Sequence, residues 1–112
     1  MRPSRAARSL QAAAPLFAAL GDETRLRLVS RLCAEGPQSI ARLTEGAAVT
    51  RQAVSKHLRV LEDAGVVRGS RDGRESVWEI EPRRLEEARR SLALVSAQWD
   101  AALDRLRTFV ER

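Results

Sequence analysis

The segment spanning residues 50–64 carries hydrogen-bond donors at helical spacing. Read as a helix, its outer face presents Gln52, Ser55, Lys56 and Arg59 at i, i+3, i+4 and i+7. Arginine and glutamine can form paired hydrogen bonds with base edges, whereas hydroxyl groups suit phosphate oxygens. No carboxylate interrupts this face before Glu62. The residue types therefore predict a DNA-binding helix.

The opposite face of this segment is apolar, as a helix packed on a core requires. Val54, Leu58 and Leu61 recur at i, i+4 and i+7. Thr50 can cap the first turn through its hydroxyl group, and Gly65 is a typical residue just beyond a last turn. The segment is thus predicted to be one bounded helix.

Composition limits the possible classes of protein. The 112 residues are 44% hydrophobic and carry a net charge of +5, which fits one domain and a polyanionic partner. A single cysteine, Cys33, excludes an intrachain disulfide and a thiolate cluster, so a cytoplasmic location is expected. No apolar run approaches the roughly 20 residues of a membrane span, so no membrane partner is expected.

The sequence pattern over residues 4–46 predicts helices. Residues 4–14 favour a helix, and Pro15 either starts a new helix or kinks one long helix. Asp22 is a plausible cap for a helix over roughly 23–34. The apolar stripe expected on that helix is Leu26, Val29 and Cys33, with Leu28 and Leu32 alongside. Ser39 then opens a shorter helix that ends near Gly46. Its residues Ile40, Ala41 and Leu43 are expected to face inward.

Beyond Gly65 the apolar period changes from that of a helix to that of strands. Residues 66–71 and 74–80 are two strand candidates joined by Asp72-Gly73, a strong hairpin signal. Arg68, Arg71 and Arg74 cluster near its tip and are added to the predicted DNA-binding residues.

A last helix is expected from Pro82 onward, with a sustained apolar heptad. Its seam exceeds what a small domain can cover alone, so it is expected to pack on a second subunit. The predicted dimerisation residues are Leu85, Leu92, Val95, Trp99, Leu103 and Leu106. The fold expected is mainly α with a small β-hairpin, in the order α-α-α-α-β-β-α.

A short helix, a tight turn, a second helix and a basic hairpin follow one another as in a winged helix-turn-helix. The chain resembles the ArsR family of bacterial transcriptional repressors. The resemblance lies in residues 16–28 (LFAALGDETRLRL), 51–61 (RQAVSKHLRVL) and 64–67 (AGVV). It implies a homodimer that binds an inverted-repeat operator in double-stranded DNA. The resemblance further implies that the major groove is faced by six residues, namely Thr50, Arg51, Gln52, Ser55, Lys56 and Arg59, and that Arg71 and Arg74 lie at the wing. It also suggests three parts: a basic arm or helix over 1–14, the winged helix-turn-helix over 15–82 and a dimerisation helix over 83–112.

The chain departs from this family where many members bind metal. Residues 39–45 contain no thiol, and the last helix has Asp100 and Asp104 but no histidine. No metal and no cofactor is therefore expected, and any small-molecule effector is unknown. His57 is interpreted as a packing or hydrogen-bonding residue.

Other functions remain open at this stage. Cys33, on the apolar stripe of its helix, is interpreted as a core residue, although a thiol-based redox-sensing repressor is an alternative. A second alternative is a winged-helix module that binds protein. An enzyme is not expected, because the chain has no nucleophile–histidine pair, no phosphate-binding glycine loop and no carboxylate dyad.

Overall fold

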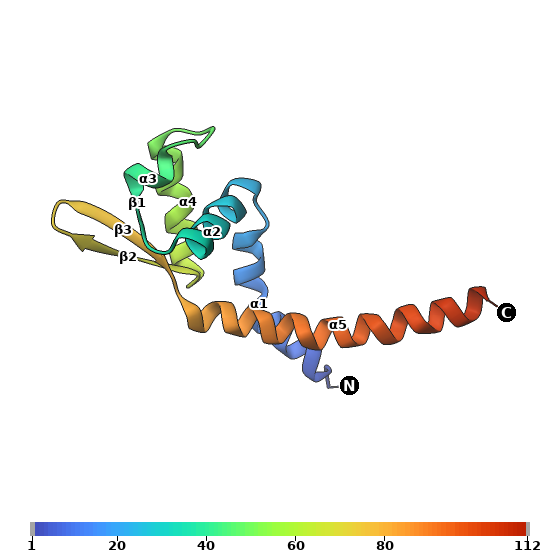
Figure 1. Cartoon of the computed structure of the whole chain (residues 1–112). Coiled ribbons are helices and arrows are strands. Elements are labelled where there is room, and N and C mark those ends of the chain that lie inside the picture. Colours follow the sequence, from blue (N-terminus) through green and yellow to red (C-terminus); the bar gives the residue numbers. More distant parts are fainter. Residues whose placement is uncertain (1, 112) are drawn as a thin grey trace.

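The computed structural model describes residues 2–111. Its helices are α1 (Arg5–Leu20), α2 (Glu23–Glu35), α3 (Ile40–Thr44), α4 (Arg51–Asp63) and α5 (Pro82–Val110). Its strands are β1 (Gln38–Ser39), β2 (Val67–Asp72) and β3 (Glu75–Ile80). The head of the molecule contains α2, α3, α4 and the sheet, and α5 extends from it as a long arm (Figure 1). The molecule is therefore elongated, with extents of 63 × 29 × 20 Å.

The N-terminal helix is one element that passes through Pro15. Ser4 caps it, because the Ser4 hydroxyl accepts a hydrogen bond from the backbone N–H of Ala7 at 3.1 Å. The structure thus selects one long helix from the two possibilities for Pro15. The helix also runs without a break across the boundary expected between residues 14 and 15.

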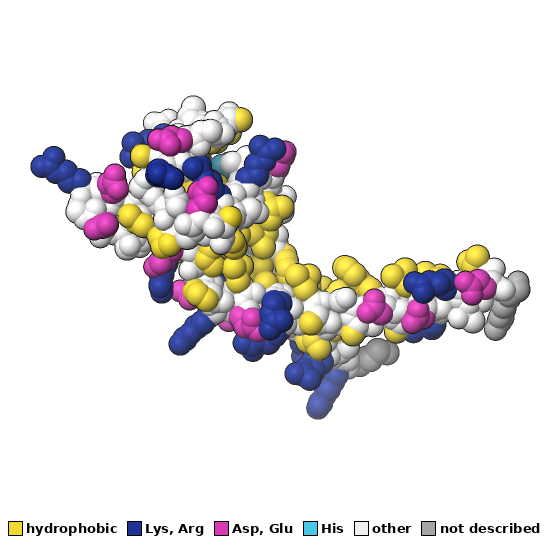
Figure 2. Space-filling view, in the orientation of Figure 1, with side chains coloured by type: hydrophobic (Ala, Val, Ile, Leu, Met, Phe, Trp, Pro, Cys, Tyr) yellow, Lys and Arg dark blue, Asp and Glu magenta, His cyan; other side chains and the backbone are white. Residues whose placement is uncertain are grey.

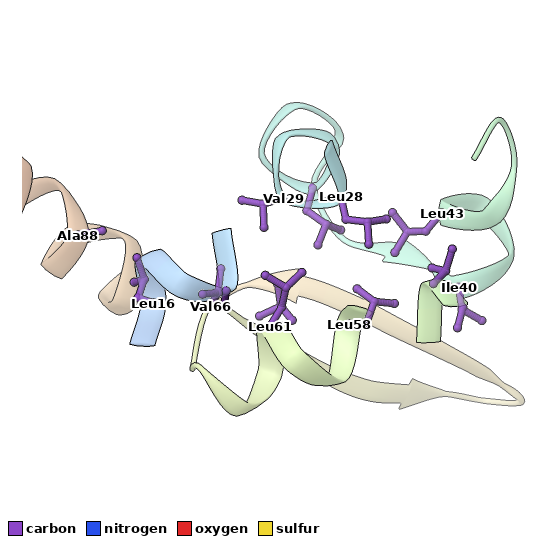
Figure 3. Close-up of a cluster of buried hydrophobic side chains, with 13 residues drawn as sticks. Leu16, Leu28, Val29, Ile40, Leu43, Leu58, Leu61, Val66 and Ala88 are labelled. Atoms are coloured by element: carbon purple, nitrogen blue, oxygen red, sulfur yellow. The ribbon is translucent and has the colours of Figure 1, made fainter. Parts of the chain in front are cut away.

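The core lies where the helices of the head meet the sheet. Figure 3 shows side chains from α1 to α4 and from the start of β2 pointing toward one another. The members with no more than 2% of their surface exposed are Leu16, Leu32, Leu43, Val54, Leu58, Leu61, Val66 and Val67. The buried stripe of α4 therefore matches its predicted apolar face.

The buried face of α2 differs from the one predicted. Leu28, Val29 and Leu32 are buried, whereas Leu26 is 50% exposed and Cys33 is also exposed. The reason is that α2 packs against α4, β3 and α1, and these neighbours cover only one of two overlapping apolar stripes. The interpretation of Cys33 as a core residue is wrong. Ala41 of α3, expected to face inward, is exposed as well.

The sheet has three antiparallel strands in the order β1-β3-β2. The sequence did not predict β1, which pairs Gln38 and Ser39 with the distant β3. Asp72 pairs with Glu75, so the two loop residues are Gly73-Arg74 and not Asp72-Gly73. Gly73 has φ +64° while Arg74 has a negative φ, as in a turn with glycine at its first central position. The hairpin is confirmed, and its turn lies one residue later.

A close contact between strands fixes residue 69 as glycine. A Cβ atom at Gly69 would lie 3.0 Å from the Trp78 ring on the neighbouring strand. The indole therefore covers the position that a side chain would need. This contact packs the two strands of the hairpin closely together.

The first half of α5 packs along α1 through small side chains. Ala6 and Ala13 of α1 are buried, as are Ala88 and Ser91 of α5. Small residues allow the two helices to approach closely, and the Ser9 and Ser91 hydroxyl oxygens lie 2.7 Å apart. This contact anchors the arm to the head.

Candidate nucleic-acid interface

The second helix of the helix-turn-helix, α4, is fixed at its first turn and along its buried face. The Thr50 hydroxyl accepts a hydrogen bond from the backbone N–H of Ala53 at 3.1 Å, as the predicted N-cap requires. Val54, Leu58 and Leu61 are fully buried beneath the helix. The opposite face of α4 is consequently directed away from the core.

This outer face brings most of the predicted DNA-binding residues together. Thr50, Gln52, Ser55, Lys56 and Arg59 line one shallow open depression, and Arg51 is exposed beside them. Among residues 2–111, the side chains of Arg51, Gln52, Lys56 and Arg59 form no hydrogen bond or ion pair. Their donor groups are therefore free to bind a ligand rather than committed to the fold.

The three arginines of the hairpin do not share one environment. The Arg68 guanidinium donates to Glu79 Oε1 at 2.8 Å and to Glu81 Oε2 at 3.3 Å. The Glu79 hydrogen bond is the largest cause of a raised Arg68 pKa, followed by the negative charges of Glu79 and Glu81. The positive charge of Arg68 is thus balanced by two carboxylates at the base of the hairpin.

Arg71 and Arg74 lie toward the tip of the hairpin and are exposed. Neither forms an ion pair or side-chain hydrogen bond within the described part of the chain. The carboxylates of Asp72 and Glu75 share the tip, so its local charge is balanced. The structure therefore leaves α4 as the cationic surface, with two free arginines on the hairpin beside it.

A polar cluster joins α4 to the turn between α1 and α2. The guanidinium Nη1 of Arg25 lies 3.4 Å from His57 Nδ1, and Arg25 Nε donates to the Ala19 carbonyl at 2.6 Å. Asp22 caps α2 by accepting from the Arg25 backbone N–H at 3.0 Å, and its Oδ2 lies 3.8 Å from His57 Nδ1. That backbone hydrogen bond is the main cause of a lowered Asp22 pKa. His57 therefore has the hydrogen-bonding role that was predicted.

Two further contacts position the far end of α4, and the sequence did not reveal them. The Glu62 carboxylate accepts from the backbone N–H of Gly69 at 3.2 Å, which ties the helix to β2. Arg84 of α5 donates to the Ala64 carbonyl at 2.9 Å, just past the last turn of α4. Arg84 follows Ala64 by 20 residues, so no local pattern indicates the pair. Through these bonds the orientation of α4 depends on the hairpin and on α5.

Known proteins share both the sequence and the arrangement of these elements. A family model described as a helix-turn-helix domain matches residues 20–70. The "Uncharacterized HTH-type transcriptional regulator YuzN" of Bacillus subtilis is 40% identical over 65 residues, which cover 53% of this chain and 71% of that protein. The solved structure of an ArsR-like transcriptional regulator from Rhodococcus sp. RHA1 has a TM-score of 0.69 and 34% identity. That alignment covers 87% of this chain and 91% of the other. The chain belongs to the ArsR family of transcriptional regulators.

The fold of this ArsR-family protein is a winged helix-turn-helix, as predicted. In these terms α3 and α4 form the helix-turn-helix and β2 and β3 form the wing. The solution structure of a homodimeric winged helix-turn-helix DNA-binding domain from Mycobacterium bovis, a possible ArsR-family regulator, is a further neighbour. It has a TM-score of 0.62 and 25% identity, and the alignment covers 89% of each chain.

The structure divides the predicted dimerisation residues between two environments. Val95 is buried against the rest of its own chain, and Leu85 is half-buried against the core. Large apolar side chains remain exposed further along α5, namely Leu92, Trp99, Leu103, Leu106, Phe109 and Val110. Figure 2 shows hydrophobic side chains at the surface along the arm.

Residues 2–111 contain no group of three or more histidine, cysteine or acidic side chains arranged to hold a metal ion. Cys33 is the one cysteine of the chain and lies at the surface. Within the same residues, no helix has both the length and the apolar character needed to cross a bilayer.

Proposed function

We propose that this ArsR-family protein is a homodimeric repressor that binds an inverted-repeat operator without a metal ion. The observation that supports this proposal best is the free outer face of α4. Arg51 and Gln52, near the N-terminal end of the helix, are suited to base edges in the major groove. Ser55, Lys56 and Arg59 follow on the same face and are suited to phosphates.

The exposed apolar side chains of α5 support the dimer. Trp99 is 62% exposed and Leu106 is 60% exposed, and both lie on the part of α5 beyond its packing on α1. A second copy would bury this surface, and a homodimeric neighbour of the same fold is known. Two-fold symmetry would then place two copies of α4 about 34–36 Å apart, one turn of DNA.

The chemistry of the side chains supports independence from metal. α3 has no thiol, and α5 offers Asp100 and Asp104 without a histidine. Carboxylates alone are poor ligands for the soft metals that thiolates select.

A DNA-binding titration tests the proposal. A labelled fragment from upstream of the chain's own gene is compared with a scrambled fragment of equal length, by fluorescence anisotropy at several salt concentrations. We expect tighter binding to the upstream fragment, a steep loss of affinity with salt, and no effect of a chelator. Equal affinity for both fragments would refute operator recognition. The same result together with capture of a protein partner would favour the protein-binding module.

A further inference from the structure

A small cavity lies between α2 and the turn that leads into α4. Its volume is about 130 Å³. Leu28, Leu43 and Val54 form its apolar floor, and Ala47 and Val49 of the turn form one wall. An apolar cavity of about 150 Å³ can hold a benzene ring, so this space has the size of one aromatic ring.

The rim of the cavity carries two guanidinium groups, each paired with a glutamate of the same helix, Arg27 with Glu23 and Arg31 with Glu35 at 3.0 Å. Arg27 and Arg31 of α2 line it, and no acidic residue does so among those the structure describes. Arg27 pairs with Glu23 at 2.7 Å, but both side chains are more than 70% exposed, so water and salt weaken that pair. Arg31 also holds the carbonyls of Leu43 and Glu45, at 3.3 and 3.0 Å. An apolar floor below a guanidinium rim fits a ligand with a compact ring and one carboxylate.

We propose that this cavity is an effector site for a small aromatic monocarboxylate. The ring would pack against Leu28, Ala47 and Val49, and the carboxylate would meet Arg27 at the rim. Binding would be non-covalent, through burial of the ring and a charge-assisted hydrogen bond to the carboxylate.

The position of the cavity links the ligand to DNA binding, and this second part rests on the proposed function. The wall formed by Ala47 and Val49 belongs to a turn without helical hydrogen bonds, in which the Ala47 N–H bonds to the Thr44 carbonyl at 3.1 Å. Thr50, the cap of α4, follows this wall directly. A ligand that fills the cavity would displace the turn, because helical hydrogen bonds do not hold the turn in place. The first turn of α4 would move with it. The ligand and the operator would then favour different positions of α4 and oppose each other.

Sodium benzoate is the probe, and amide NMR shifts of the full-length protein without DNA test the site by itself. A fragment of this size is expected to bind with a dissociation constant of about 1 mM. We expect saturable shifts centred on Thr24 and residues 46–50, and about fivefold weaker binding of the neutral analogue benzamide. Shifts that fail to saturate, or that map elsewhere, would overturn the proposal. Equal affinity for benzamide would overturn the choice of a carboxylate.

Matched variants give an independent test. Ala47→Leu should fill the cavity and abolish the saturable shifts, whereas Ala41→Leu, on the exposed side of α3, should keep them. Because Ala47→Leu could disturb the fold, a second pair uses exposed arginines that each form an ion pair within one helix. Arg27→Gln should weaken benzoate binding about fivefold, and Arg107→Gln should leave it unchanged. Equal behaviour within either pair would overturn the site.

The link to DNA is measured separately, with total sodium held constant by sodium chloride because salt alone weakens DNA binding. Saturating benzoate should raise the operator dissociation constant about tenfold in the wild type, and Arg27→Gln should need about fivefold more benzoate for half of that change. Saturable benzoate binding without this change would refute the link while leaving the site in place. If no DNA fragment is bound at all, the proposed function fails and the NMR result on the site still stands.

Discussion

Removal of the Lys56 charge should change the salt dependence of DNA binding by a predictable amount. Lys56 is exposed on α4 and has no intrachain partner among the described residues. Each phosphate neutralised contributes about 0.9 to the slope of log affinity against log salt concentration. A homodimer carries two copies, so Lys56→Gln should reduce that slope by about 1.8.

This change in slope corresponds to a large change in relative affinity. Between about 50 and 200 mM salt, a fourfold range, the advantage of the wild type over Lys56→Gln should shrink by about twelvefold. The measurement is a fluorescence anisotropy titration of the operator at four or more salt concentrations. The same titration on a random fragment should show a similar change, since phosphates carry no sequence information.

Arg68→Gln is the matched control, because it also removes one exposed positive charge. The Arg68 guanidinium is engaged by Glu79 and Glu81, so it is not available to a phosphate. We expect the slope of this variant to stay within error of the wild type. If Lys56→Gln leaves the slope unchanged, or if Arg68→Gln lowers it equally, the assignment of α4 as the phosphate-contacting surface is refuted.

Four other predictions follow from the structure. Gln52→Ala should cost about 1–3 kcal/mol on the operator and little on random DNA in the same titration; equal losses would contradict base contact. Trp99→Glu should convert the dimer to monomer in sedimentation velocity, because it places a charge in the proposed interface, and an unchanged dimer would exclude this surface. Gly69→Ala should lower the free energy of unfolding in urea by about 1–3 kcal/mol, since its Cβ would meet the Trp78 ring at 3.0 Å; unchanged stability would contradict that contact. The lowered pKa of Asp22 means that its carboxylate stabilises the fold above the ordinary value of 3.8 and loses this effect as the pH falls through the lower folded value. Asp22→Asn should therefore flatten the decline in thermal stability below about pH 4, and an unaltered decline would contradict the assignment.

Local sequence patterns were sufficient to predict α4 and most of its surface. The apolar period, the hydroxyl cap at Thr50 and the glycine at position 65 all act within one helix, so they can be read without knowledge of the fold. Once the buried face is assigned to Val54, Leu58 and Leu61, the outer face of Gln52 and Lys56 follows from helical geometry.

Features that depend on a distant partner could not be predicted in this way. In α2, the stripe through Leu26 and Cys33 and the stripe through Leu28 and Leu32 are both apolar, and only contact with α4 and β3 decides which is buried. Similarly, β1 exists because Gln38 and Ser39 find partners on β3. The Arg68 ion pairs depend on which residues face each other across the hairpin, and the turn position sets that register.

The continuous apolar pattern of α5 covers two different contacts, one with α1 of the same chain and one proposed with a second copy. The pattern continues over 29 residues, and a helix of that length spans about 44 Å, more than the head can cover. As far as Val95, small residues let α5 approach α1 closely, so the chain itself buries Ala88, Ser91 and Val95 and leaves Leu92 exposed. From Trp99 onward the residues are large and exposed, which would be unfavourable for an isolated helix in water. The change from small to large side chains therefore marks where intrachain packing ends, and it places the proposed contact with a second copy on Leu92 and on the large apolar residues from Trp99 onward.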